Sequence, residues 1–279
     1  MKICIFFLVL IAVATVATVS TVSTVSNNQK QHNWKQKNVQ IHKRQHSTKV
    51  IAHQGASGDA IPNSIEAFEL AIKQGANIIE LDVQICSSGE VIVFHNQHIE
   101  SGKHYLKDMT FKEIKKKMPY VPTINEVLDV VNGKVDLLIE TKGNAAVLPT
   151  LMQILQEQVK NNKWSAEQFL ISSFDQYHLK TIDDDYRKAD LQKIQTIALT
   201  MSLPLGQAKS FKAIGVSGIA VNQSVLTKEF VIDAHSRNLD VFVFTVNFIP
   251  IMDRLVQFEV DGIITNFPQR LKNLLDKPE

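Results

Sequence analysis

The sequence predicts a (β/α)8 barrel over residues 49–279, an α/β fold of the TIM-barrel class, and three observations lead to it. From Lys49 onward, short apolar runs alternate with helical stretches and form eight units in about 230 residues. Several runs are continuously apolar, such as Val-Phe-Val-Phe at 241–244, which is typical of parallel strands buried on both faces. The first run also lacks the glycine-rich turn of a dinucleotide-binding open sheet, which favours the closed barrel.

The predicted elements follow from these runs in chain order. The strands are the apolar runs at 49–53, 78–85, 135–141, 169–174, 194–200, 217–222, 240–246 and 262–265. The helices are the helical stretches at 64–74, 124–132, 147–161, 175–186, 206–213, 227–238, 248–259 and 268–275. The helix at 124–132 stands immediately before the third of these strands, and the last helix closes the chain.

A hairpin is predicted at the end of the second strand. Ser88-Gly89 is a candidate two-residue turn between residues 83–85 and 91–94. In that register, residues whose numbers sum to 177 face each other, so Asp82 would face His95. The hairpin would thereby return His95 to the strand end that carries the carboxylates described below.

The N-terminus has the pattern of an export signal. Residues 3–14 are continuously apolar behind Lys2, which is the length of a signal-peptide core and shorter than the roughly 20 residues of a spanning helix. Small residues suited to cleavage follow, and a Thr-Val repeat runs through residues 15–26. We therefore expect residues 1–26 to be a signal peptide of a periplasmic or secreted protein, with an uncleaved membrane anchor as the alternative.

The charge of the chain is unevenly distributed. Residues 1–50 hold seven of the 30 Lys and Arg residues and none of the 28 Asp and Glu residues, so the remaining body has 23 basic and 28 acidic residues. Because this body has an acidic excess, no nucleic acid partner is expected. Residues 27–48 are rich in Asn, Gln, Lys and His and are interpreted as a solvated linker, and the basic segment 27–50 is a candidate contact to an anionic membrane surface.

Polar side chains suited to catalysis gather where the first three predicted strands end. The first strand ends in His53, the second carries Glu80 and Asp82, and the third carries Glu140 followed by Lys142. In a barrel of this class the active site lies at the carboxyl ends of the strands. Residues two apart in a strand point to the same side, so these side chains are expected to converge.

The three carboxylates predict a site for one divalent cation. Neighbouring carboxylates repel each other and are best tolerated with a cation between them. Glu80, Asp82 and Glu140 are an all-oxygen ligand set that suits Ca²⁺ or Mg²⁺, and no Cys/His spacing typical of zinc competes with it. His53 and His95 beside this site suit general base and general acid roles at a phosphorus or carbonyl centre.

At these residues the sequence resembles the glycerophosphodiester phosphodiesterase family over about residues 49–270. The segments that carry the resemblance are Ile-Ala-His-Gln-Gly at 51–55, Asn-Ser-Ile-Glu-Ala-Phe at 63–68, Ile-Glu-Leu-Asp-Val at 79–83, Val-Phe-His-Asn at 93–96, Leu-Ile-Glu-Thr-Lys at 138–142, Ser-Ser-Phe at 172–174, Phe-Thr-Val-Asn at 244–247 and Gly-Ile-Ile-Thr-Asn-Phe-Pro at 262–268. Each motif is weak alone, and their common order and spacing make them specific together.

The resemblance implies a TIM barrel in which Glu80, Asp82 and Glu140 bind the cation. It also implies that His53 and His95 are the acid–base pair and that Lys142 holds a phosphate oxygen. The sequence does not decide which histidine plays which role, and our hypothesis is that His53 is the base and His95 the acid. The implied reaction is metal-dependent hydrolysis of glycerophosphodiesters to an alcohol and glycerol 3-phosphate. A small-molecule phosphodiester or a lysophospholipid is the implied substrate.

Four substitutions depart from the family pattern, the mildest being Asn96 in place of the Asp that follows the second histidine. The Arg that follows the first histidine is Gln54, and the Glu of the next loop is absent at Pro62, so one hypothesis is that a paired Arg and Glu were lost together. Loss of the Arg removes a bidentate phosphate contact, and Gln54 is then the candidate residue at this position for binding the substrate phosphate. The aromatic residue before Thr-Val is Phe244 in place of the frequent Trp, which alters the predicted pocket wall.

Two further interpretations compete with the leading one. A lysophospholipase D or a sphingomyelinase D-like phosphodiesterase is one alternative. Sphingomyelinase D and phosphatidylinositol-specific phospholipase C share related two-histidine barrels, although Glu140 with Lys142 and the Gly-Ile-Ile-Thr-Asn segment at 262–266 favour the glycerophosphodiesterase. A catalytically inactive barrel that binds a phosphodiester is the alternative from a different class, and Gln54 and Pro62 are the substitutions that favour it.

Overall fold

The structure is a computed structural model that describes residues 47–277 except residues 101, 144–145 and 189–193. The predicted signal peptide or anchor at 1–26, and the linker at 27–48 apart from its last two residues, lie outside the described residues. Among the residues that are described, no helix has both the length and the apolar character needed to span a membrane.

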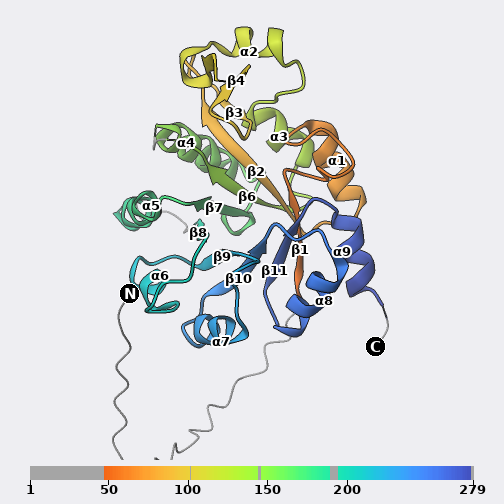
Figure 1. The fold of residues 1–279 in the computed structure, drawn as a ribbon. Coiled ribbons are helices and arrows are strands. Elements are labelled where there is room, and N and C mark those ends of the chain that lie inside the picture. Colours follow the sequence, from red (N-terminus) through yellow and green to blue (C-terminus); the bar gives the residue numbers. More distant parts are fainter. Residues whose placement is uncertain (1–46, 101, 144–145, 189–193, 278–279) are drawn as a thin grey trace, which may run out of the picture. The chain divides into compact units, whose positions relative to one another are not determined.

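Eight parallel strands close into a barrel surrounded by helices, which confirms the predicted fold class (Figure 1). The strands are β1 (Lys49–His53), β2 (Ile78–Ile85), β6 (Asp136–Thr141), β7 (Phe169–Ser173), β8 (Gln195–Thr200), β9 (Gly218–Asn222), β10 (Asp240–Phe244) and β11 (Gly262–Thr265). Their order is β1-β11-β10-β9-β8-β7-β6-β2, and pairing of β1 with β2 closes the ring. Each strand end lies within two residues of its prediction.

The predicted helices are present between and after these strands. They are α1 (Ile65–Lys73), α3 (Ile124–Val131), α4 (Val147–Lys160), α5 (Gln176–Lys188), α6 (Lys209–Ala213), α7 (Lys228–Ser236), α8 (Ile249–Gln257) and α9 (Pro268–Leu275), with the 3-10 turn η2 (Ala166–Gln168) before β7. Side-chain caps set several starts: the Ser64 hydroxyl accepts from the Ala67 N–H before α1, and Thr123 and Glu126 form a capping box before α3.

Two apolar layers lie on the two faces of the barrel sheet. The larger packs the sheet against the helices, and the smaller fills the barrel with Ile51, Ile78, Leu138, Leu170, Ile197, Leu199, Ala220, Phe242 and Ile264. Side chains alternate along a strand, so the residues two positions further toward the carboxyl end also point inward. Above Ile51, Ile78, Leu138 and Leu170 these residues are His53, Glu80, Glu140 and Ser172. The polar site is therefore the top layer of the barrel interior.

The hairpin after β2 exists, but its predicted register was wrong by one residue. In β3 (Val91–Val93), Val93 pairs with Val83 and Val91 with Ile85, so facing residues sum to 176. The Cys86 N–H bonds the Glu90 carbonyl and the Gly89 N–H bonds the Cys86 carbonyl, which leaves a three-residue loop. Gly89 at φ 94° supplies the left-handed residue of such a loop. Asp82 consequently lies opposite Phe94, whose N–H bonds the Asp82 carbonyl, and not opposite His95.

A small excursion between β3 and α3 was not predicted. It contains the two-stranded ribbon of β4 (His98–Ile99) and β5 (His104–Tyr105), the 3-10 turn η1 (Leu106–Asp108) and α2 (Phe111–Lys117). Its residues pack around a separate apolar cluster that includes Ile92, Leu106 and Ile114. These strands are two residues long and α2 has seven residues, so hydrophobic periodicity carries little signal there.

Candidate active site

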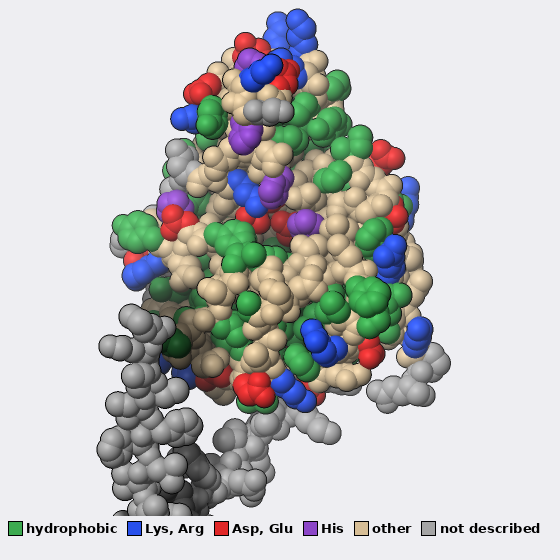
Figure 2. Space-filling view, in the orientation of Figure 1, with side chains coloured by type: hydrophobic (Ala, Val, Ile, Leu, Met, Phe, Trp, Pro, Cys, Tyr) green, Lys and Arg blue, Asp and Glu red, His purple; other side chains and the backbone are tan. Residues whose placement is uncertain are grey.

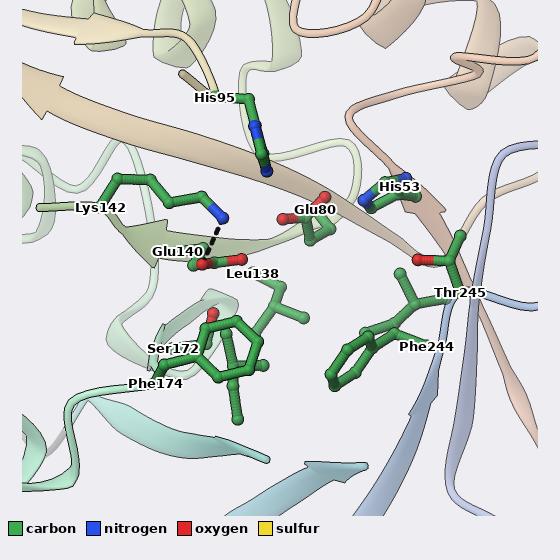
Figure 3. Close-up of a pocket in the computed structure, with 12 residues that line it drawn as sticks. His53, Glu80, His95, Leu138, Glu140, Lys142, Ser172, Phe174, Phe244 and Thr245 are labelled. Carbon is green, nitrogen blue, oxygen red and sulfur yellow. Dashed lines mark ion pairs between the residues drawn. The ribbon is translucent and has the colours of Figure 1, made fainter. Parts of the chain in front are cut away.

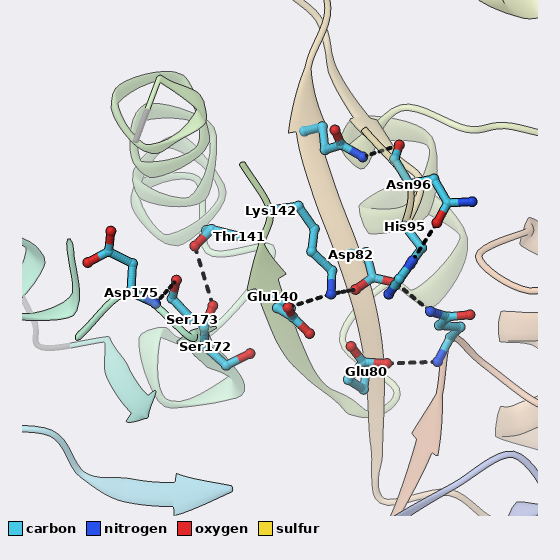
Figure 4. Close-up of polar contacts among 12 residues, drawn as sticks. Glu80, Asp82, His95, Asn96, Glu140, Thr141, Lys142, Ser172, Ser173 and Asp175 are labelled. Atoms are coloured by element: carbon cyan, nitrogen blue, oxygen red, sulfur yellow. Dashed lines mark hydrogen bonds and ion pairs between the residues drawn. The ribbon is translucent and has the colours of Figure 1, made fainter. Parts of the chain in front are cut away.

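Three buried carboxylates from two neighbouring strands form the centre of the candidate site (Figure 4). Glu80 and Asp82 lie on β2, and Asp82 pairs in register with Glu140 on β6. One oxygen of each carboxylate lies within 4.8 Å of the others. The convergence that the strand periodicity predicts is therefore present.

The loop after β1 aims donors at these carboxylates. The Gln54 N–H donates to Glu80 Oε2 at 2.8 Å, and the Gln54 side-chain amide donates to Asp82 Oδ2 at 2.7 Å. Asn63 from the same loop donates to the same Asp82 oxygen at 2.8 Å. Gln54 has φ 55°, a left-handed conformation that turns both of its donors toward the carboxylates. Its side chain is engaged with Asp82 and does not line the cavity described below, and Pro62 is exposed.

Lys142 lies between two of the carboxylates (Figure 4). Its Nζ is 2.5 Å from Glu140 Oε1 and 3.2 Å from Asp82 Oδ1. Burial lowers the pKa of Lys142, but the attraction of Asp82 and Glu140 outweighs burial and raises that pKa above its ordinary value. The ammonium is therefore a permanent positive charge at the site.

The electrostatics of the cluster fit a divalent cation. Burial and the neighbouring Asp82 and Glu140 carboxylates raise the pKa of Glu80 well above its ordinary value. Burial, opposed by Lys142 and reinforced by Asp82, likewise raises the pKa of Glu140. Three buried carboxylates against one ammonium leave an excess of negative charge, which a cation with oxygen ligands would neutralise. The three carboxylates could therefore hold a metal ion, as their spacing predicts.

The two histidines approach Glu80 from different sides (Figure 3). His53 stands at the end of β1, and its Nδ1 is 2.7 Å from the side-chain oxygen of Asn266, which follows β11. A carboxamide oxygen accepts and never donates, so His53 Nδ1 carries the proton and its Nε2 is the basic nitrogen. Burial lowers the pKa of His53 more than this hydrogen bond raises it.

His95 is the more exposed of the pair. It stands two residues beyond β3, and its Nδ1 is 2.9 Å from the Asn96 side-chain oxygen. His95 lines the cavity although the register that predicted it was wrong, because the one-residue shift still leaves the chain beside Asp82, where the Phe94 N–H bonds the Asp82 carbonyl. Both imidazoles are thus oriented by neutral asparagine partners.

A cavity of about 280 Å³ joins these groups (Figures 2 and 3). Its polar side is formed by His53, Glu80, His95, Glu140, Lys142 and Ser172. Its apolar side is formed by Leu138, Phe174, Leu199, Phe244 and Ile264, with Thr245 beside them. Phe244 is therefore a wall residue, as predicted, and it meets Phe174 edge to face at 6.0 Å between ring centroids.

Sequence reasoning missed two functional candidates. Ser172 lines the cavity, is buried, and has a hydroxyl with no hydrogen-bond partner among the described residues. It lies in register with Glu140, so its inward position on β7 is the signal that identifies it. Asn266 lies 213 residues from His53, and its own N–H is held at 2.9 Å by Asn247. Its contact to His53 is decided by barrel closure and has no local sequence signal.

Comparisons with known proteins agree with this geometry. The model of the Glycerophosphoryl diester phosphodiesterase family matches residues 53–270. The glycerophosphodiester phosphodiesterase of Caldanaerobacter subterraneus subsp. tengcongensis is 30% identical over 82% of this chain and 98% of that protein. The glycerophosphodiester phosphodiesterase of Bacillus altitudinis is 29% identical over 80% of this chain and 96% of that protein.

Solved structures share the fold. The Oleispira antarctica phosphodiesterase in complex with the product sn-glycerol-3-phosphate matches with a TM-score of 0.70 at 23% identity, over 82% of this chain and 97% of that one. A Silicibacter pomeroyi structure described as a putative glycerophosphoryl diester phosphodiesterase matches with a TM-score of 0.70 at 24% identity, over 83% and 94%.

Proposed function

Because the chain belongs to the glycerophosphoryl diester phosphodiesterase family and is a phosphodiester hydrolase, we propose that it hydrolyses glycerophosphodiesters with two histidines and one divalent cation. The products are an alcohol and glycerol 3-phosphate. The observation that carries the proposal is the placement of His53 and His95 on different sides of a buried three-carboxylate cluster that Lys142 flanks.

Glu80, Asp82 and Glu140 would hold the cation, because their oxygens converge and their mutual repulsion needs a positive charge. A bound Ca²⁺ or Mg²⁺ supplies a Lewis acid that neutralises charge on a phosphoryl oxygen. Gln54 and Asn63 hold Asp82 in place through the oxygen that faces the β1 loop.

His53 is assigned as the general base. Its Nδ1 proton is held by Asn266, and the lowered pKa keeps the ring neutral near pH 7, so Nε2 can accept a proton. The nucleophile that gives up this proton is a water molecule or a neighbouring hydroxyl of the substrate. His95 is assigned as the general acid that protonates the departing alkoxide from the more exposed side of the cavity.

Lys142 is assigned to a non-bridging phosphate oxygen. Its raised pKa keeps it charged, and its reach to two of the carboxylates places that charge beside a substrate anion bound over them. Phe244 and Phe174 form the wall against which the organic part of the substrate packs.

A lysophospholipid is a second candidate substrate, favoured by the apolar half of the cavity. Five of the lining residues have purely hydrocarbon side chains, which a free glycerophosphodiester does not need. An acyl chain attached to the glycerol would cover them. The first assay therefore compares glycerophosphocholine with lysophosphatidylcholine.

The assay uses the full chain with Ca²⁺, with Mg²⁺ and with a chelator. We expect turnover that is lost with the chelator and falls by about 10²–10⁴ in His53→Ala. His104→Ala, which changes an exposed histidine of the β4–β5 ribbon, is the matched control and should keep full activity. Absence of turnover with either cation would instead favour an inactive barrel that binds phosphodiesters, and binding of glycerophosphocholine would then be measured on the same samples.

We also propose that the enzyme acts outside the cytoplasm. The apolar residues 3–14 support export, and the basic segment 27–50 supports contact with an anionic membrane surface. Intact-mass measurement of the protein recovered from an exporting host distinguishes a cleaved signal from a retained anchor.

A further inference from the structure

Exposed apolar side chains collect on the loops that follow the barrel strands. Among the described residues, the large hydrophobic side chains left in solvent include Leu205 at 105% exposure, Phe248 at 63%, Met201 at 58% and Phe174 at 48%. Phe174 follows β7, Met201 and Leu205 follow β8, and Phe248 follows β10. We call these four residues the apolar rim. All four lie at the carboxyl end of the barrel, where the cavity opens.

The three loops that carry this rim, and the three other loops beside them at the same end of the barrel, have almost no charge. They are residues 174–175, 201–208, 223–227, 245–248, 266–267 and 54–64, which follow β7, β8, β9, β10, β11 and β1. Together they contain no Lys or Arg and only two acidic residues, Asp59 and Asp175, although charged residues make up 21% of the chain. By contrast, residues 86–122, which follow β2, contain six lysines and four acidic residues.

The rim is continuous with the cavity. The strands β7 to β11 and then β1 are consecutive neighbours around the barrel, so their loops adjoin one another. Phe174 belongs to both surfaces, since it lines the cavity and packs on Phe244. Met201 contacts the end of β9, where the Asn222 amide donates to its sulfur at 3.7 Å. Figure 2 shows hydrophobic side chains bordering the histidine and lysine side chains at the site.

We propose that the apolar rim docks the mouth of the active site onto a zwitterionic phospholipid surface. The four side chains protrude from three separate loops and offer no groove for a folded partner, whereas a lipid surface deforms around each of them. The exposed Arg270 of α9 stacks on Phe267 and bonds the Asn247 carbonyl, but the loops themselves carry almost no charge, which matches a zwitterionic surface better than an anionic one. Docking would let the phosphodiester group of a lipid enter the cavity while its apolar part stays in the lipid layer. This role of the rim in catalysis rests on the proposed function.

The direct test places a fluorophore on the rim of the full chain. Leu205→Trp is mixed with phosphatidylcholine vesicles whose acyl chains are brominated, and its emission is compared with that of Ile232→Trp, an exposed position on α7. Trp34 and Trp164 are common to both variants and to the parent chain, so their signal can be subtracted. We expect quenching of the residue at 205 and none at 232, even if the N-terminal segment also holds the protein on the vesicle.

Equal quenching at both positions, or none at either, would overturn the proposal. A blue-shifted emission of Leu205→Trp without vesicles would also overturn it, because the rim would then be covered by protein. Dependence of that shift on protein concentration would identify a second copy, and independence would identify a segment of the same chain.

The second test separates docking from chemistry. The triple variant Met201→Ser, Leu205→Ser, Phe248→Ser leaves the cavity-lining residues intact. We expect unchanged turnover of soluble glycerophosphocholine and at least about tenfold lower turnover of lysophosphatidylcholine carried in phosphatidylcholine vesicles. Equal rates on both substrates for variant and parent would contradict docking. If the parent turns over neither substrate, the proposed function fails, while the quenching result still decides whether the rim docks.

Discussion

At the scale of single residues, each of the two histidines is hydrogen-bonded to an uncharged asparagine side chain, although carboxylates lie nearby. Asn266 accepts from His53 and Asn96 accepts from His95, in each case at Nδ1. A carboxamide fixes the tautomer without adding the negative charge that would stabilise an imidazolium. His53 therefore stays a weak, neutral base in a site that already contains three carboxylates.

Asn266 should act as a positioning residue for His53. We expect Asn266→Ala to lower kcat by about tenfold with little change in KM, because the ring loses its orientation and tautomer. Asn266→Asp should restore the orientation and move the acidic limb of the pH–rate profile to higher pH, since a carboxylate favours the protonated ring and raises the pKa of His53. Rate profiles of the two variants check this, with Asn273→Ala on α9 as the control that should match the parent.

Ser172 should contact substrate through its unpartnered hydroxyl. We expect Ser172→Ala to lower kcat/KM by about tenfold, the value of one lost hydrogen bond, without lowering the stability of the fold. Thr196→Val is the matched control: its hydroxyl is also buried without a partner, but it lies on the face of β8 opposite the inward-pointing Ile197. Kinetics and urea unfolding of both variants are the measurements. Equal kinetic effects of the two substitutions would remove Ser172 from the site.

At the scale of elements, the β2–β3 hairpin decides where His95 lies. Its loop depends on Gly89 at φ 94°, a conformation that is costly for residues with a Cβ atom. The observed pairing, with Val83 opposite Val93, is shifted by one residue from the pairing that a two-residue turn would give. His95 consequently lies beyond the paired part of the hairpin, where it is exposed and held by Asn96.

Gly89→Ala should reduce stability through backbone strain alone. A Cβ atom at this position would meet no other atom within 4 Å, so the expected loss of about 1–2 kcal/mol comes from the left-handed conformation. Gly206→Ala is the control, because its Cβ atom would also be in open space and its φ is ordinary; it should be neutral or slightly stabilising. Chemical unfolding measures both variants. A Gly89→Ala protein as stable as Gly206→Ala would show that the loop does not need its left-handed residue.

At the scale of the whole molecule, barrel closure and the cation site are coupled. The carboxylates stand on β2 and β6, while the loop that supports Asp82 follows β1, which pairs with both β2 and β11. Burying three carboxylates costs folding free energy, and the raised pKa of Glu80 expresses that cost. A cation that binds only the folded barrel should therefore stabilise the entire domain.

Saturating Ca²⁺ or Mg²⁺ should raise the thermal midpoint of the parent chain. At a cation concentration of 100 times the dissociation constant, the free energy of unfolding should rise by about 2.7 kcal/mol. Glu80→Gln should abolish this shift and should be more stable than the parent without cations, because one buried charge is removed. Glu157→Gln, on the exposed side of α4, should keep the shift. Scanning calorimetry with and without chelator checks all three proteins. A cation shift that persists in Glu80→Gln would place the cation elsewhere.

The sequence by itself determined the barrel and most of the site. Eight apolar runs predicted all eight strands, because burial on both faces leaves few polar positions in them. Among the polar residues of these strands, His53, Glu80, Asp82 and Glu140 are titratable groups toward the carboxyl ends of neighbouring strands, and strand alternation was enough to predict their convergence.

Only the tertiary structure decided which hydrogen-bond partners and neighbours these residues have. The hairpin register depended on whether the loop had two or three residues, and the same Ser-Gly pair is compatible with both. Gln54, predicted as a phosphate contact, donates to Asp82, because its left-handed backbone turns its side chain toward that carboxylate. The Asn266 contact to His53 joins residues 213 positions apart and forms only when β11 pairs with β1. Periodicity within a strand determines which face a side chain takes, but contacts between strands depend on closure of the ring.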